Sequence, residues 1–407
     1  MRNALVDARQ YTRHCYAHLH DDDPVFPCVP TVNPARWELG HIAWFQEYWC
    51  LRHGTSMRPG DPAGAARASC LPGADAFYDS SKVPHDARWS LDLPDWRGTL
   101  RYLDETLGSV LGELGRAAAS ARYFFELALL HEDMHGEALA MTLQSLALPP
   151  PAEWTLPEPA RGAGTGGDLE VAGGVHAIGS GADEKRARFV FDNEREVHEV
   201  TLEPFAIARA CVTEGEFAAF VDDGGYERES LWSDDGRRWL AAARRSLPAY
   251  WRRANGFEVR WFDRWRPLAV ARAMQHVNAW EAEAYAAWAR RRLPTEAEWE
   301  VAAVTAPGAA LDRNLDARHS GPVASDAGAT GASHLLGNVW EWTSSPFQPY
   351  PGFVPGPYAD YSQPWFGDHR VIRGGSWATR SRLVHARMRN FYLPGRHDMF
   401  VGFRTCV

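Results

Sequence analysis

The sequence has no long apolar run, no paired cysteine motif and no surplus of basic residues. No stretch approaches the roughly 18 uncharged apolar residues of a membrane-spanning helix, so we expect no membrane partner. Charges from Met1 to Arg9 stand where a signal peptide needs an apolar run, which predicts a cytoplasmic protein. The six cysteines form no C-x-x-C pair, which argues against a disulfide scaffold or a cysteine-type zinc site. With a formal net charge of −9, we expect no nucleic-acid partner.

Aromatic residues are abundant, with 18 Trp, 18 Phe and 13 Tyr making up 12% of the chain. A buried tryptophan needs a partner for its N–H, so tryptophan suits the walls of a ligand site better than an ordinary core. The length of 407 residues corresponds to two or three domains at about 150 residues each. The sequence carries no prediction of oligomeric state.

The chain divides near residue 150. Helical patterns fill residues 1–148, and they predict a four-helix bundle. A Pro- and Gly-rich linker is predicted at 149–168. The expected helices lie near residues 3–20, at Asn33 to Arg52, at Leu91 to Leu114 and at Ala121 to Leu148.

Residues 169–407 have short β-type runs such as Val197 to Leu202, Gly-rich turns and isolated helices, which predict one α+β domain. The fold class of the whole chain is therefore α+β. Three helix starts carry capping boxes, in which the first residue and a glutamate three positions later bind each other's backbone N–H. These pairs are Thr213 with Glu216, Asn278 with Glu281, and Thr295 with Glu298.

The segment His131-Glu132-Asp133-Met134-His135 carries the clearest chemical signal. Residues at i and i+4 share one helical face, so both imidazoles can reach one metal ion. A catalytic metal needs a third ligand, and Glu137 is a poor candidate because it lies around the helix from both histidines. His41 lies within an inward aromatic stripe and fits the role, although a hydrogen-bonded core histidine is the ordinary interpretation of His41 alone.

Two metals remain open at this point, because a three-histidine site suits zinc, or iron that must bind O2 and a substrate together. The same letters satisfy the zinc-protease pattern H-E-x-x-H, with Glu132 as general base. The extended form of that pattern would need Gly at Ala138 and His at Met141, and neither is present.

The second half resembles the formylglycine-generating-enzyme domain, a C-type-lectin-like α+β fold, and the first half resembles the DinB-like bundle. The bundle motifs are Trp37-x-x-Gly40-His41 and His131/His135/Glu137. The motifs of the second half are Gly173-Gly174, Ile178-Gly179, Phe191 to Arg195, Leu293 to Glu300, Gly337 to Trp342, Arg373 to Trp377 and Gly402 to Arg404.

This pair of domains is similar to the non-heme iron sulfoxide synthases of ergothioneine biosynthesis and to their relatives, the selenoneine synthases. The resemblance implies Fe(II) held by His41, His131 and His135, with O2 as co-substrate. It also implies that a chalcogen is bonded to the imidazole carbon of Nα-trimethylhistidine (hercynine). The expected partners are therefore small molecules: hercynine and a selenosugar or a thiol donor, cysteine or γ-glutamylcysteine.

The resemblance also assigns substrate-binding positions. Asn390 matches a residue that holds hercynine, and Arg396 matches one that holds the donor's carboxylate. The chain departs from the γ-glutamylcysteine-using enzymes at four of the other five positions. Fewer charged groups there favour a neutral selenosugar. Those enzymes have Trp-Asp where this chain has Phe391-Tyr392, two arginines where it has His85 and Arg88, and Gln where it has Met134, so of these five only Arg88 is kept.

The family's catalytic tyrosine is expected in the loop before Phe366, where Tyr358 and Tyr361 are the candidates. Two other functions compete with the synthase hypothesis. One is the zinc hydrolase with Glu132 as base, and the other is a catalytically silent binding module. A formylglycine-generating role is disfavoured because Cys211 and Cys406 do not form the closely placed thiol pair expected there.

Overall fold

The protein is described by a computed structural model that covers the chain except residues 20–25, 54–66, 119–120, 156–165, 307–312 and 326–330. Part of the predicted linker, 156–165, thus lies outside the described residues. The chain forms two compact units. The first joins Met1–Pro151 with Pro355–Tyr361, and the second joins Ala152–Val354 with Ser362–Val407. The mixture of helices and strands confirms the α+β class.

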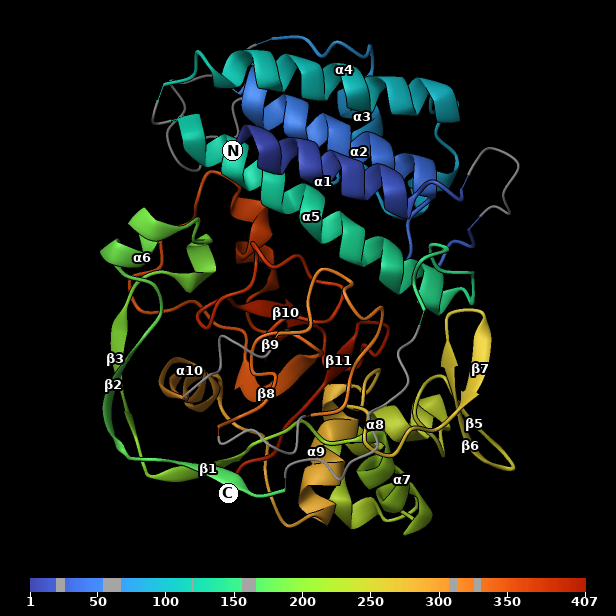
Figure 1. Cartoon of the computed structure of the whole chain (residues 1–407), viewed down its shortest axis with the longest axis vertical. Helices are drawn as coiled ribbons and strands as arrows, with labels where there is room; N and C mark the ends of the chain where they lie inside the picture. Colours follow the sequence, from blue (N-terminus) through green and yellow to red (C-terminus); the bar gives the residue numbers. More distant parts are fainter. Residues whose placement is uncertain (20–25, 54–66, 119–120, 156–165, 307–312, 326–330) are drawn as a thin grey trace. The chain divides into compact units, whose positions relative to one another are not determined.

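The first unit is built from helices (Figure 1). α1 packs against α4 and α5, and α2 packs against the same two helices. Apolar side chains of α1, α4 and α5 form a shared core of Leu5, Ala8, Val110, Phe125 and Leu129. The bounds are α1 Arg2–Cys15, α2 Ala35–Glu47, α3 Ala74–Tyr78, α4 Trp96–Leu114 and α5 Arg122–Ser145, with a π-helix at Tyr48–Arg52 and a 3-10 turn at Asp86–Trp89.

The four predicted helices are present, with shorter ends. α4 begins at Trp96 because the side chain of Asp95 caps it, accepting a hydrogen bond from the N–H of Gly98 at 2.6 Å. α5 ends at Ser145 because Ala147 has a left-handed φ of 55°, which stops the helix before the prolines. α1 ends at Cys15, earlier than predicted.

Among the residues that the structure describes, the second unit contains four small sheets. β10-β9-β8-β11 is the largest, and only its β8–β11 pair is parallel. The other sheets are antiparallel: β1 with β4, β2 with β3, and β5-β6-β7. The bounds are β1 Asp168–Val171, β2 Gly174–Ile178, β3 His198–Leu202, β4 Phe205–Ala208, β5 Trp251–Ala254, β6 Gly256–Trp261, β7 Arg264–Pro267, β8 Trp340–Pro346, β9 Arg370–Arg373, β10 Asn390–Tyr392 and β11 Val401–Gly402.

All three predicted capping boxes are confirmed, and they open α7, α9 and α10. The run from Val197 to Leu202 forms β3, as predicted. The helices of this unit are α6 Ala182–Ala187, α7 Glu214–Asp222, α8 Asp234–Ala243, α9 Ala279–Trp288 and α10 Glu296–Thr305, and the 3-10 turns are Asp192–Glu194, Glu229–Leu231 and Gln363–Trp365.

Tryptophans of the second unit are core residues. Trp299, Trp342 and Trp377 have no exposed surface. Trp299 donates its N–H to Glu341 at 2.8 Å, and Trp342 donates to the carbonyl of Val277 at 2.9 Å. Much of the tryptophan excess therefore reflects this fold rather than the walls of a ligand site.

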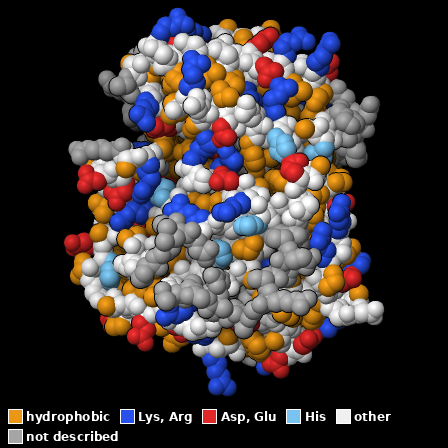
Figure 2. Space-filling view, in the orientation of Figure 1, with side chains coloured by type: hydrophobic (Ala, Val, Ile, Leu, Met, Phe, Trp, Pro, Cys, Tyr) orange, Lys and Arg blue, Asp and Glu red, His pale blue; other side chains and the backbone are white. Residues whose placement is uncertain are grey.

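No helix within the described ranges is long and apolar enough to cross a membrane. On the face that Figure 2 shows, acidic and basic side chains are interspersed.

Candidate metal centre

His41 from α2 and the pair His131 and His135 from α5 meet inside the first unit. One ring nitrogen of each lies within 4.8 Å of the others, and within the described part of the chain these three residues form a group that could hold a metal ion. The Nε2 atoms of His131 and His135 are 3.2 Å apart. Two nitrogens bound to one ion at about 2.1 Å would lie roughly 3 Å apart, so the spacing fits a shared ion.

His135 is oriented by a buried carboxylate. Its Nδ1 lies 2.6 Å from Oε1 of Glu38, whose side chain is 8% exposed. Because an ionised carboxylate only accepts, Nδ1 carries the proton and Nε2 keeps its lone pair for a metal. Burial opposes ionisation of Glu38, but the contact with His135 outweighs it and lowers the pKa of the carboxyl below its ordinary value.

His41 is oriented by the backbone. Its Nδ1–H donates to the carbonyl of Tyr78 at 2.8 Å, which leaves Nε2 as the acceptor nitrogen. The ring also stacks on Trp37, with centroids 4.9 Å apart. Gly40 lets α2 lie this close to Tyr78, since a Cβ atom at position 40 would lie 2.2 Å from the Tyr78 ring. The motif Trp37-x-x-Gly40-His41 therefore builds one side of the site.

His131 is held by stacking. Its ring lies on Phe45 with centroids 3.5 Å apart and planes 5° apart. Its Nδ1 is buried and has no hydrogen-bond partner in the part of the chain that the structure describes. The aromatic contact therefore sets the orientation of this third ring.

The two most buried histidines of the cluster are neutral. Burial lowers the pKa of His41 to about 3, and the adjacent His135 adds to this effect. Burial, together with His135 and His41, lowers the pKa of His131 well below its ordinary value. Neutral imidazole is the metal-binding form, so the donor set suits zinc or iron.

Glu132 is held in a buried ion pair with Arg9. Its Oε1 binds Nε of Arg9 at 2.7 Å, and both side chains are buried. The same guanidinium donates to Gln46 at 3.0 Å and to the carbonyl of Leu103. A carboxylate engaged in a buried ion pair is unavailable to activate a metal-bound water. This contact argues against the hydrolase interpretation.

Both candidate tyrosines lie in the segment Pro355–Tyr361, which belongs to the first unit. The ring of Tyr358 lies 5.1 Å from that of Phe45, the residue that stacks on His131. Burial, then Asp360 and Asp79, raise the pKa of Tyr358. The ring of Tyr361 lies 6.1 Å from that of Tyr358.

The predicted substrate residues of the first unit are held by internal contacts. His85 donates from Nε2 to the carbonyl of Val32 at 2.8 Å. Arg88 donates to Oδ1 of Asn33 at 2.7 Å, and its guanidinium lies 3.9 Å from the centroid of Trp37. Met134 is half-buried on α5, next to His135.

The other predicted substrate residues lie in the second unit, on β10 and the turn after it. Oδ1 of Asn390 accepts from the N–H of Phe391, and that ring stacks on Phe347 with centroids 3.9 Å apart. Arg396 binds Asp398 through Nε at 2.9 Å and lies 4.6 Å from the centroid of Tyr392.

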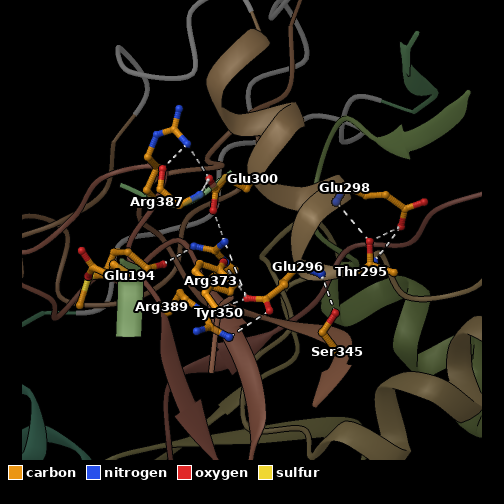
Figure 3. A network of polar contacts seen from close by, with 12 residues as sticks. Glu194, Thr295, Glu296, Glu298, Glu300, Ser345, Tyr350, Arg373, Arg387 and Arg389 are labelled. Carbon is orange, nitrogen blue, oxygen red and sulfur yellow. Dashed lines mark hydrogen bonds and ion pairs between the residues drawn. The ribbon is translucent and has the colours of Figure 1, made fainter. Parts of the chain in front are cut away.

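A buried network positions this strand (Figure 3). Arg389, the residue before β10, binds Glu296 through Nε at 2.9 Å. Arg373 of β9 binds Glu300, and it also donates to the carbonyl of Met388 at 2.7 Å. The glutamates of the Leu293 to Glu300 motif thus hold the backbone that carries Asn390.

Sequence reasoning missed the partners Glu38, Arg9, Phe45 and Tyr78. Glu38 gave one usable signal, because it lies three residues before His41 and therefore on the same side of α2. The contacts of Arg9, Phe45 and Tyr78 depend on how the helices pack against one another, which the sequence does not reveal.

The comparisons with known proteins match this architecture. Residues 4–139 match the model of the DinB superfamily, and residues 155–407 match that of the Sulfatase-modifying factor enzyme 1-like domain. The fold and the site therefore define a two-domain protein of the class that joins these two families.

Within that class, three of the relatives found are named hercynine oxygenase. The chain is 37% identical to the one from Mycolicibacterium thermoresistibile, covering 98% of this chain and 93% of the relative. It is 35% identical to the one from Mycolicibacterium smegmatis, covering 92% and 91%. A protein from Schizosaccharomyces pombe named ergothioneine biosynthesis protein 1 is 26% identical, covering 53% of this chain and 27% of that protein. The chain belongs to the hercynine oxygenase family, and the prediction of an oxygenase-type enzyme is confirmed.

Proposed function

We propose that this enzyme uses Fe(II) and O2 to join selenium or sulfur to the imidazole carbon of hercynine, with His41, His131 and His135 as the iron ligands. The three-histidine cluster in a chain of this family is the observation that carries the proposal. When bound, the iron would supply open coordination positions for the substrate imidazole, the chalcogen donor and O2.

The residues around the cluster would control water and protons. Trp37 and Phe45 pack on the histidine rings and exclude water. The ring of Tyr358 contacts Phe45, which stacks on His131, so we assign Tyr358 as the proton donor in preference to Tyr361. Met134 of the first unit and Asn390 of the second are proposed as substrate-binding residues.

We assign the donor as a selenosugar, so that selenoneine would form after oxidation and cleavage. Two cations that could hold an acidic dipeptide are already engaged, since Arg88 binds Asn33 and Arg396 binds Asp398. Phe391 and Tyr392 would supply aromatic faces that suit a sugar, and His85 is proposed as a further neutral donor-binding residue.

A thiol donor, cysteine or γ-glutamylcysteine, is the second candidate, and it would give a C–S bond. The similarity to the curated hercynine oxygenases and to the ergothioneine biosynthesis protein favours it.

Anaerobic reconstitution tests both candidates. The protein is loaded with Fe(II), mixed with hercynine and one donor at a time, exposed to O2 and sampled by mass spectrometry. We expect an adduct with the selenosugar, whereas an adduct only with a thiol would reassign the donor. If none of the donors gives an adduct, the proposed function is contradicted.

A matched pair of variants controls this experiment. His131→Ala is expected to lose bound iron and product. His53→Ala, which changes a histidine of the same unit outside the cluster, is expected to keep both.

A further inference from the structure

Glu38 connects the two helices that supply the metal-binding histidines. It lies on α2, three residues before His41, yet its carboxylate accepts the hydrogen bond of His135 on α5 at 2.6 Å. The residue is 6% exposed, so little water competes for this contact.

The choice of a carboxylate at this position has a consequence for proton placement. A neutral imidazole carries one proton on either of its two nitrogens. The carboxylate accepts and does not donate, so it selects the form with the proton on Nδ1 and the lone pair on Nε2. A glutamine could present either its oxygen or its NH2 group, and the second orientation would leave the proton on Nε2, where it blocks metal binding.

The three histidines also differ in the strength of their partners. His41 donates to a neutral carbonyl at 2.8 Å, and His131 has no partner for Nδ1 among the described residues. His135 alone of the three donates to a carboxylate. A charged acceptor makes a stronger hydrogen bond and raises the basicity of the other ring nitrogen.

We propose that Glu38 is a positioning residue of the metal centre, which holds His135 in its metal-binding form and makes it the strongest donor of the three histidines. The inference rests on the proposed function in one respect, namely that these histidines hold the metal. It adds that one carboxylate on α2 sets the affinity and the electronic properties of the ion.

Glu47 offers a matched control on the same helix. It is also a buried glutamate, 3% exposed, and it accepts three hydrogen bonds. Its donors are Tyr102 at 2.6 Å, Ser69 at 2.5 Å and the N–H of Cys70 at 2.7 Å, none of which belongs to the histidine cluster. Replacing Glu47 therefore removes a buried charge from α2 without touching a metal ligand.

The test is titration of the metal-free full-length protein with Co(II), followed by visible absorption, with unfolding of each metal-free variant as the measure of stability. Loss of the signal in His131→Ala identifies it as coming from the cluster. We expect Glu38→Gln to bind Co(II) about 10- to 100-fold more weakly and to change its absorption bands. Glu47→Gln should bind Co(II) like the wild type, whatever its loss of stability.

Two results would overturn the inference: wild-type affinity and spectrum in Glu38→Gln, or an equal loss of affinity in Glu47→Gln. If Glu38→Gln does not fold, Glu38→Asp decides, since it keeps the charge but draws the carboxylate back from Nδ1. It should then show weaker Co(II) binding and altered bands, and unchanged values would overturn the inference.

The outcome can be separated from that of the proposed function. A wild-type protein that binds Co(II) at the cluster but forms no hercynine adduct would remove the proposed function and leave the role of Glu38 standing. An active wild type whose Glu38→Gln variant has unchanged metal binding would remove only the inference.

Discussion

The three histidines behave differently because different groups stand behind them. A carbonyl orients His41, a carboxylate orients His135 and an aromatic ring orients His131. The pair at i and i+4 could be predicted from sequence because helical geometry alone puts both residues on one face. The partner of each ring could not, because each partner comes from another helix: Tyr78 from α3, and Glu38 and Phe45 from α2.

At the same scale, Tyr358 and Tyr361 can be told apart. We predict that Tyr358→Phe keeps the metal but lowers the rate of product formation about 100- to 10,000-fold, the usual contribution of a positioned proton donor. The measurement is the single-turnover rate together with metal content. Loss of metal in this variant would mean that the ring supports Phe45 rather than delivering a proton.

Tyr361→Phe is the control, because it removes a hydroxyl from the same segment, Pro355–Tyr361. We expect a rate near that of the wild type. The opposite ranking of the two variants would transfer the role to Tyr361.

At the scale of elements, the position of His41 depends on the close approach of α2 to α3. A Cβ at position 40 would fall 2.2 Å from the buried ring of Tyr78, whose carbonyl holds His41. We predict that Gly40→Ala destabilises the protein by about 1–3 kcal/mol and weakens Co(II) binding, because Tyr78 must move. Chemical unfolding and Co(II) titration measure the two effects.

Gly108→Ala on α4 is the matched control, since a Cβ there would meet nothing within 4 Å. It should stabilise the protein by about 0.5–1 kcal/mol through helix propensity and leave Co(II) binding unchanged. A stable Gly40→Ala variant with normal metal binding would show that the helices can separate without cost.

Element identity was largely predictable, and element ends were not. The four bundle helices follow from hydrophobic periodicity, and the capping boxes fix the first turns of α7, α9 and α10. α5 stops before its prolines because Ala147 takes up a left-handed conformation, which no composition rule requires of alanine.

At the scale of the whole molecule, buried ionisable groups make the free energy of unfolding depend on pH. Glu194 has no exposed surface, and neither carboxyl oxygen has a hydrogen bond within the described residues. Burial raises its pKa to about 8, against opposition from Arg188 and Arg373. His385 faces it at 3.5 Å and is neutral, because burial lowers the pKa of that imidazole to about 3.

We predict that Glu194→Gln gains stability relative to the wild type as pH rises from about 5 to about 8. An acid whose pKa is higher in the folded state stabilises the protein at low pH. It loses that contribution as pH rises through the folded pKa. The difference should be on the order of a few kcal/mol and is measured by urea unfolding at several pH values.

Glu298→Gln supplies a control of opposite sign. Burial opposes ionisation of Glu298, but the hydrogen bond from Arg292 outweighs it and lowers the pKa of the carboxyl. That variant should lose more stability at neutral pH than in acid. Parallel pH profiles for the two variants would contradict the assignment of Glu194.

The sequence by itself determined the two architectures, the three histidines and the family. These depend on local periodicity and on motifs that can be recognised, in order, along the sequence. Tertiary structure decided what surrounds the cluster: the ion pair that occupies Glu132, the carboxylate behind His135, and the return of Pro355–Tyr361 to the first unit. Those contacts join residues about 100 or more positions apart, and only the packing of whole helices and loops brings such groups within hydrogen-bonding or ring-contact distance.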